Sequence, residues 1–284
     1  MKRIYSCFVF SVLAILFLSC NDKGQRKPTI VVTIEPQRYF VEQLADSLFE
    51  VVTMVPAGIS PETYDPTPVQ MATLAQSCAY FRIGKIGFEQ VWMEKIRSNN
   101  PQLPIYDNGE GIDYIVPDEA HGHSEGADPH TWVSTKEALI IVENMCNALI
   151  ALDKSHERQF RSNLERLKME IHRTDSLLTE LLADIPVRSF LIYHPALTYF
   201  ARDFQLKQYC IETDGKEPSA EQMKALVDIA EAEGVKAMFV QQEFDRKNAE
   251  IIAQETGCRL EVINPLSYHW SEELIRIAKI LADE

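Results

Sequence analysis

Short apolar runs alternate with helical patterns in two separate stretches of this chain, and this alternation limits the folds that it can adopt. The first stretch contains apolar runs at 30–34, 51–55, 80–83 and 104–106. Helical patterns lie between these runs, at 36–49, 69–76 and 88–97. The alternation resumes later in the chain, with apolar runs at 189–193, 206–211, 235–240 and 260–263. Apolar runs of strand length that alternate with helices predict parallel sheets covered by helices.

We therefore expect an α/β protein with two Rossmann-like lobes, each built on a central parallel sheet. The predicted bounds are 29–153 for the first lobe and 185–284 for the second. Residues 155–182 form a long helical pattern with charges on most faces, about 40 Å at the helical rise. We predict a rigid connecting helix within 154–184 that crosses the molecule rather than entering one core. Because open α/β sheets bind ligands at the carboxyl ends of their strands, we expect the site between the lobes.

The first twenty residues predict export. Met1-Lys2-Arg3 is positively charged, and residues 4–19 are almost wholly apolar but too few to cross a bilayer comfortably. Leu18-Ser19-Cys20 resembles a bacterial lipobox, which predicts a signal peptide at 1–19, lipidation of Cys20 and a linker at 20–28. The alternative is an ordinary signal peptide with an unmodified cysteine. We expect a periplasmic or cell-surface lipoprotein that meets the membrane only through its lipid anchor.

The charge balance argues against one class of partner. The chain has 28 Lys and Arg against 42 Asp and Glu, a formal net charge of −14. Such a negative net charge repels nucleic acid and attracts cations.

Outside the leader there are four cysteines without a close CxxC pair, and we expect all of them to be small buried side chains: Cys78, Cys146, Cys210 and Cys258.

Three candidate metal ligands lie at the ends of predicted strands or of the polar loop. Glu62 belongs to the proline-rich loop after the run 51–55, and His194 directly follows the run 189–193. His130 stands where the polar stretch 107–129 ends. Two imidazoles and a carboxylate are common ligands of divalent transition metals, so these side chains from both lobes can converge on one ion.

Several motifs follow one another along the chain. They are Pro56-Ala57-Gly58 with Asp65-Pro66-Thr67-Pro68, Asp128-Pro129-His130-Thr131-Trp132, His194-Pro195-Ala196-Leu197-Thr198-Tyr199-Phe200, Glu217-Pro218-Ser219 and Asn264-Pro265-Leu266. In this order they are similar to those of the cluster A-I solute-binding proteins of bacterial ABC importers. The resemblance covers essentially the whole chain after the leader. It implies capture of Zn²⁺ or Mn²⁺ outside the inner membrane, with an ABC permease and its ATPase as partners.

The resemblance also implies a ligand set. In that family the first three ligand positions usually carry His and the last often carries Asp; by position these are Glu62, His130, His194 and Asn264. Glu62 and Asn264 depart from the usual pattern, as if one carboxylate had moved from the fourth position to the first. Manganese-binding members have Glu at the third position, so His194 favours Zn²⁺. The oxygen ligands form a harder set, which leaves Mn²⁺ or Fe²⁺ as alternatives.

The sequence leaves the roles of several other side chains open. Three lie near predicted strand ends of the second lobe and could complete the ligand set: Gln242, Glu243 and His269. Asp128 could orient the neighbouring histidine or serve only the turn. His121 and His123 are similar to a shortened form of the His-rich loop of zinc-type members, and could hold a weak second ion or have no role.

The motifs of hydrolases and nucleotide-binding enzymes are missing from the sequence. It contains no His-Glu-x-x-His, no Gly-x-Ser-x-Gly and no phosphate-binding glycine loop. We therefore predict a monomeric binding protein that is not an enzyme, and a zinc hydrolase is the least favoured function. An adhesin-type surface lipoprotein stays as an alternative, because the family is related to such proteins.

Overall fold

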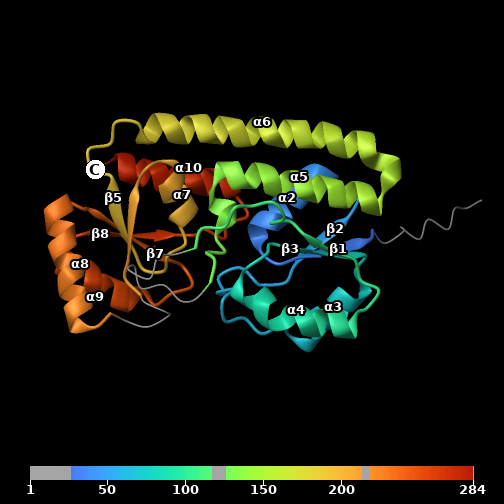
Figure 1. Ribbon diagram of the computed structural model, residues 1–284, viewed down its shortest axis with the longest axis horizontal. Coiled ribbons are helices and arrows are strands. Elements are labelled where there is room, and N and C mark those ends of the chain that lie inside the picture. The colour runs from blue at the N-terminus through green and yellow to red at the C-terminus, as the bar shows by residue number, and fades with distance from the viewer. Residues whose placement is uncertain (1–26, 117–125, 213–217, 284) are drawn as a thin grey trace, which may run out of the picture.

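The computed structural model describes residues 27–116, 126–212 and 218–283. These residues form two four-stranded sheets, in which all neighbouring strands pair in parallel (Figure 1). One sheet belongs to the first half of the chain and the other to the second half. The predicted α/β class with two sheet-based lobes is confirmed.

The first sheet has the strand order β2-β1-β3-β4. Its strands are β1 (Thr29–Val32), β2 (Glu50–Thr53), β3 (Ala79–Arg82) and β4 (Ile105–Asp107). The connections run through α2 (Glu35–Ala45), α3 (Pro68–Gln76) and α4 (Gly87–Asn99). Helices on both faces bury the central strands, which is why their sequences are apolar without alternation. Because all four strands are parallel, their carboxyl ends lie along one edge.

The second sheet repeats this arrangement, with the strand order β6-β5-β7-β8. Its strands are β5 (Ser189–Ile192), β6 (Lys207–Cys210), β7 (Ala237–Gln241) and β8 (Arg259–Ile263). Its helices are α7 (Thr198–Asp203), α8 (Ala220–Glu233), α9 (Arg246–Thr256) and α10 (Trp270–Ala282). In both sheets the first strand lies beside the second and the third, so the two halves share one topology.

Two helices connect the halves. The short 3₁₀ turns η2 (Thr131–Val133) and η3 (Lys154–His156) precede α5 (Thr135–Leu152) and α6 (Glu157–Leu182). Figure 1 shows α6 along the top of the molecule, above both sheets. It packs on α2 and α5 of the first half and on α10 of the second. The prediction of a long helix that crosses the molecule is confirmed.

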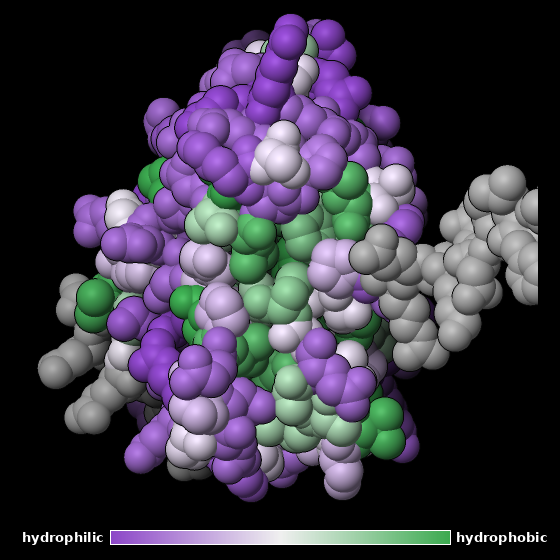
Figure 2. Space-filling model, turned by 90° about the vertical axis from the view of Figure 1, so that its right-hand side faces the viewer, coloured by the Kyte–Doolittle hydropathy of each residue, from purple (hydrophilic) through white to green (hydrophobic). Residues whose placement is uncertain are grey.

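The expectation that this helix crosses the molecule rather than entering one core was wrong in its second part. Buried side chains recur every three or four residues on α6 and form one stripe, in which Thr174 stands between the apolar residues Ile171 and Leu178. The apolar members of the stripe are Phe160, Leu164, Leu167, Ile171, Leu178 and Leu182. They belong to one hydrophobic core that also contains Ile30 of the first sheet and Phe190 of the second. The charges seen in the sequence occupy the remaining faces. Figure 2 faces the end of the molecule where α5 passes into α6, and its upper part is hydrophilic.

Some predictions fall on parts of the chain that are not described. The leader, Cys20 and the loop residues His121 and His123 lie outside the described residues. The lobe bounds and the linker stay predictions. In the described part of the chain, no helix is both long and apolar enough to span a membrane.

The cysteines differ in burial. Cys146 and Cys258 are buried, as expected, whereas Cys78 and Cys210 are only partly buried. Within the described ranges, no disulfide joins any two of these cysteines. Cys210 ends β6 and Cys258 precedes β8, and these strands form opposite edges of the second sheet. Their separation across the sheet leaves them unable to form a disulfide with each other.

Candidate metal centre

Three of the four predicted ligands line a single cavity between the two halves. Glu62 reaches it from the loop between β2 and α3, His130 from the residue before η2, and His194 from the end of β5. The other lining residues are Ser60, Pro61, Trp132, Ala196, Glu243, Pro265 and Leu266. Asn264, the fourth predicted ligand, is not among the described lining residues, although the two residues after it are.

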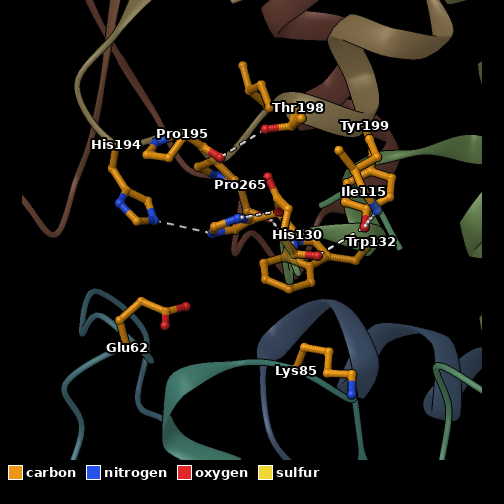
Figure 3. Close-up of polar contacts among 12 residues, drawn as sticks. Glu62, Lys85, Ile115, His130, Trp132, His194, Pro195, Thr198, Tyr199 and Pro265 are labelled. Atoms are coloured by element: carbon orange, nitrogen blue, oxygen red, sulfur yellow. Dashed lines mark hydrogen bonds and ion pairs between the residues drawn. The ribbon is translucent and has the colours of Figure 1, made fainter. Parts of the chain in front are cut away.

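The two imidazoles face each other. His130 Nε2 and His194 Nε2 lie 3.3 Å apart, and the rings meet edge to face with centroids 5.1 Å apart. Figure 3 shows both rings pointing toward one another from different parts of the chain. Two imidazole nitrogens bound to one tetrahedral zinc ion at about 2.1 Å are about 3.4 Å apart. The observed separation therefore fits two ligands of one ion.

A buried carboxylate orients His130. Asp128 Oδ1 accepts a hydrogen bond from the backbone N–H of His130 at 2.8 Å and lies 2.9 Å from its Nδ1. Both roles considered for Asp128, in the turn and beside the imidazole, therefore occur together. Tyr199 reinforces the turn because its hydroxyl donates to the Asp128 carbonyl oxygen at 2.9 Å. A ligating histidine is commonly fixed in this way by a carboxylate on its second nitrogen.

His194 has a carboxylate partner that the sequence did not reveal. Its Nδ1 lies 2.5 Å from Glu212 Oε1. Gln241 holds the His194 backbone on both sides, accepting from its N–H at 3.4 Å and donating to its carbonyl oxygen at 2.6 Å. Phe244 stacks on the ring with centroids 5.2 Å apart. Glu212 lies just after β6, the strand that pairs with β5. Its position at a strand end is the sequence feature that could have identified it.

This arrangement leaves the two Nε2 lone pairs directed at one another. Each Nδ1 lies against a carboxylate oxygen and so carries the proton of the neutral ring. Two bare nitrogens at this distance repel unless a proton or a metal ion lies between them. Burial alone would lower the pKa of His130, but Asp128, with Glu62 and Glu243, more than offsets this and raises it above 6.5. A proton is therefore the natural competitor of the metal.

Glu62 is held at the start of α4. Its Oε2 accepts a hydrogen bond from the Gly87 N–H at 3.0 Å, while its Oε1 is buried with no hydrogen-bond partner in the described structure. Figure 3 places Glu62 on a separate loop, apart from the paired imidazoles. Among the described residues, no three His, Cys, Asp or Glu side chains lie close enough to hold an ion without movement. The described arrangement therefore brings the two imidazoles together while the Glu62 carboxylate stays on the Gly87 side of the cavity.

Replacing Gly87 with alanine will weaken metal binding. An added Cβ would lie 2.6 Å from Glu62 Oε2 and 2.7 Å from its carbonyl oxygen, so the loop that carries Glu62 must shift. We expect a loss of about tenfold or more in Zn²⁺ affinity, the effect typical of disturbing a ligand's support. The measurement is competition with a chromogenic chelator. Ser98→Ala, at the exposed far end of α4, is the control, and equal affinities would show that Glu62 does not depend on Gly87.

The remaining candidates near the cavity differ in position. Glu243 lines it; its Oε2 is buried with no partner in the described structure, and desolvation raises its pKa. Asn264 Oδ1 is likewise buried and without a described partner. Gln242 is exposed, and the His269 side chain is 69% exposed. Of the open candidates in the second half, only Glu243 reaches the cavity within the described part of the chain.

Two parallel-sheet halves joined by a spanning helix, with imidazoles and carboxylates between them, are the features of a binding protein for a small cation. Residues 30–275 match the family described as "Zinc-uptake complex component A periplasmic". This match covers well over half of the chain, and the protein belongs to that family. Members of the family are periplasmic metal-binding transport proteins.

Individual relatives agree with this assignment. The chain is 25% identical over 284 residues to the zinc-binding lipoprotein AdcA of Streptococcus pneumoniae, covering 94% of this chain but 56% of that protein. It thus spans about half the length of that relative. It is 23% identical over 293 residues to the high-affinity zinc uptake system protein ZnuA of Bacillus subtilis, covering 96% of this chain and 91% of the relative.

Solved structures show the same fold. A crystal structure of ZnuA superposes with a TM-score of 0.85 at 35% identity, over 90% of this chain and 98% of the other. A manganese-bound mutant of a periplasmic metal binding protein from Candidatus Liberibacter asiaticus superposes with a TM-score of 0.80 at 21% identity. That match covers 90% of this chain and 99% of the other, and at this identity it shows the fold alone.

Proposed function

We propose that this protein is the extracytoplasmic substrate-binding lipoprotein of an ABC importer and that it captures a divalent transition metal, foremost Zn²⁺. The observation that carries this proposal is the pair of imidazole nitrogens 3.3 Å apart in a cavity shared by both halves. The proposed ligands are His130, His194 and Glu62, while Asn264 stays a prediction. Cys20 is the proposed site of the lipid anchor, with an ABC permease and its ATPase as partners.

The support around the two imidazoles favours a metal receptor over an enzyme. Asp128 and Glu212 each lie against the Nδ1 of one imidazole, so the neutral ring turns its Nε2 lone pair toward the cavity, which is the form that binds a metal. A hydrolytic metal site also needs an open position for water with a general base nearby. A receptor needs only ligands, a cavity and an exit. We therefore propose binding without catalysis, by a monomer.

The metal is proposed from the donor atoms. Two imidazole nitrogens favour Zn²⁺, whereas the Glu62 carboxylate is a harder ligand that Mn²⁺ and Fe²⁺ also accept. The relatives named for zinc support the first choice. The Irving–Williams order places Zn²⁺ above Mn²⁺ at such a site. Zinc is accordingly the ion expected to win in direct competition.

Release is proposed to occur through small movements of loops. The Trp132 indole donates to the Pro265 carbonyl oxygen at 2.8 Å, and the Trp270 indole donates to the Trp132 carbonyl oxygen at 2.6 Å. These buried bonds tie the segment after His130 to the start of α10 and to the segment before it, and α6 packs on both halves. Wide rotation of one half against the other would break them. Movement of the Glu62 loop alone would open the cavity without that cost.

Metal content is the direct test. The chain from residue 21 onward, purified without chelator, is expected to contain about one equivalent of zinc by elemental analysis, in keeping with a single paired-imidazole cavity. His130→Ala and His194→Ala should each lose it, because each removes one of the two facing nitrogens. When Zn²⁺ and Mn²⁺ are supplied together at equal concentrations, the protein should bind zinc. A protein that refuses both added ions would contradict the proposed function.

A further inference from the structure

The cavity receives a carboxylate from each half of the molecule. Glu62 lines it from the loop after β2, and Glu243 lines it from the turn between β7 and α9. The paired imidazoles of His130 and His194 line the same cavity. Two nitrogen donors and two carboxylates therefore surround one space, although the family's usual ligand positions include only one of these carboxylates.

Glu243 resembles Glu62 in having one buried carboxylate oxygen without a described hydrogen-bond partner, and in this it differs from Glu212 and Glu89. Glu243 Oε2 is buried, and no described residue hydrogen-bonds to it. Glu212, in the same half, contacts the imidazole of His194 at 2.5 Å. The fully buried Glu89 accepts hydrogen bonds from three donors: Thr33 Oγ1, Ile83 N and Gly84 N. A buried carboxylate oxygen without a partner costs free energy, and a bound cation would remove that cost.

Asn264 does not occupy the same space. The residues after it, Pro265 and Leu266, line the cavity, whereas Asn264 is absent from the described lining. Its backbone N–H donates to Glu273 Oε1 at 2.7 Å, which holds this segment against α10. Among the described residues of the second half, Glu243 is therefore the one that offers the cavity a carboxylate.

We propose that Glu243 is the fourth ligand of the captured ion, which is then held by two imidazoles and two carboxylates. This inference rests on the function proposed above. Glu62 and Glu243 together carry a charge of −2, which neutralises a divalent cation completely, whereas Glu62 with a neutral amide carries only −1. Complete neutralisation matters in a cavity shielded from water, where an uncompensated charge is costly.

This ligand set has two consequences. Because one carboxylate comes from each half, the ion bridges the two halves and stabilises the bound arrangement of both. Two imidazoles with two carboxylates are also harder than three imidazoles, which suits Zn²⁺ and brings Mn²⁺ and Fe²⁺ closer to it in affinity. Glu62, which stands where the family usually has histidine, is then one of two carboxylate ligands in the site.

The test compares Glu243→Gln with Glu255→Gln in the chain from residue 21 onward. Both variants remove one negative charge from the second half without changing side-chain volume, but Glu255 is exposed on α9. Zn²⁺ affinity is measured by chelator competition at low and at high salt, and metal-free melting is followed by circular dichroism. Glu243→Gln is expected to weaken Zn²⁺ binding about 10- to 100-fold or more at both salt concentrations. Losing a direct ligand costs more affinity than losing a residue that only supports a ligand.

The two variants separate coordination from a general loss of charge. Glu255→Gln should bind Zn²⁺ nearly as tightly as the unchanged protein, since an exposed distant charge is screened by salt. Metal-free Glu243→Gln should melt at the same temperature or higher, because it removes a buried carboxylate oxygen without a described partner. Equal Zn²⁺ affinities for the two variants, or a lower melting temperature for metal-free Glu243→Gln, would overturn the inference.

Failure of this inference is distinguishable from failure of the proposed function. If the unchanged protein binds no Zn²⁺, the proposed function itself is wrong and the inference falls with it. If it binds Zn²⁺, loses it in His130→Ala and keeps it in Glu243→Gln, the metal receptor stands and only the assignment of Glu243 is wrong.

Discussion

Lowering the pH from about 7.5 to about 5.5 will weaken Zn²⁺ binding by between about tenfold and about 100-fold, because one proton competes for the ligand pair. The pKa of His130 is raised above its ordinary value of 6.5: burial opposes the charged form, but Asp128 and the cavity carboxylates outweigh it. Below that pKa a proton occupies the space between the two Nε2 atoms. Each further pH unit then costs about one factor of ten in affinity. Titrations in buffers of constant ionic strength would measure this slope.

Asp128→Asn is the matched variant for the pH experiment. The amide oxygen can still accept from the backbone and ring N–H groups of His130, but it no longer favours the imidazolium. The pKa of His130 should therefore fall, and the loss of Zn²⁺ affinity should begin at a lower pH than in the unchanged protein. An affinity that stays constant from about pH 7.5 to about pH 5.5 would exclude the imidazoles as ligands.

Leu178→Ala will lower the free energy of unfolding by about 2–5 kcal/mol, and the protein will still unfold in one transition. Leu178 is fully buried in α6, within a core that contains residues of both sheets. The truncation leaves a cavity that this close-packed core cannot fill. Because the core is continuous, loss of packing at α6 destabilises both halves together. Urea denaturation followed by tryptophan fluorescence and by circular dichroism would measure both effects.

The neighbouring residue provides the control for this prediction. Leu177 is 37% exposed on the same helix, so Leu177→Ala should change the free energy of unfolding far less. Phe160→Ala, about five helical turns before Leu178 on α6, should cost about 3–5 kcal/mol and move the same single transition. Two separated transitions, with only one of them shifted in each variant, would show that the halves unfold independently.

The elements of the fold were predictable because each leaves a local pattern. The runs 30–34, 80–83 and 189–193 became the buried strands β1, β3 and β5, with bounds that differ by at most two residues. Helix α6 was predicted almost to its ends, but its role in the core was not. Its stripe of one buried residue every three or four positions is narrow, and the charges on the other faces obscured it in the sequence.

The candidate site was predictable only in part. His130, His194 and Glu62 stand at strand or loop ends, and they line one cavity. Asn264 was inferred by position along a motif, which does not report where a side chain points. Glu243 was left open together with Gln242 and His269, because all three lie near strand ends. The structure distinguishes them by the exposure of their side chains, which depends on neighbours far away in the chain.

The sequence by itself determined the class of fold, the order of its strands and helices, the leader-like start and the family motifs that contain the two histidines. These depend on periodicity and on residue types within short windows. Only the tertiary structure decided that the two Nε2 atoms meet, since His130 and His194 are 64 residues apart in the chain. It also decided that Glu212 supports His194 and that Glu243, not Asn264, reaches the cavity. Such contacts follow from how the two sheets pack against a shared core and direct their side chains, which no local pattern contains.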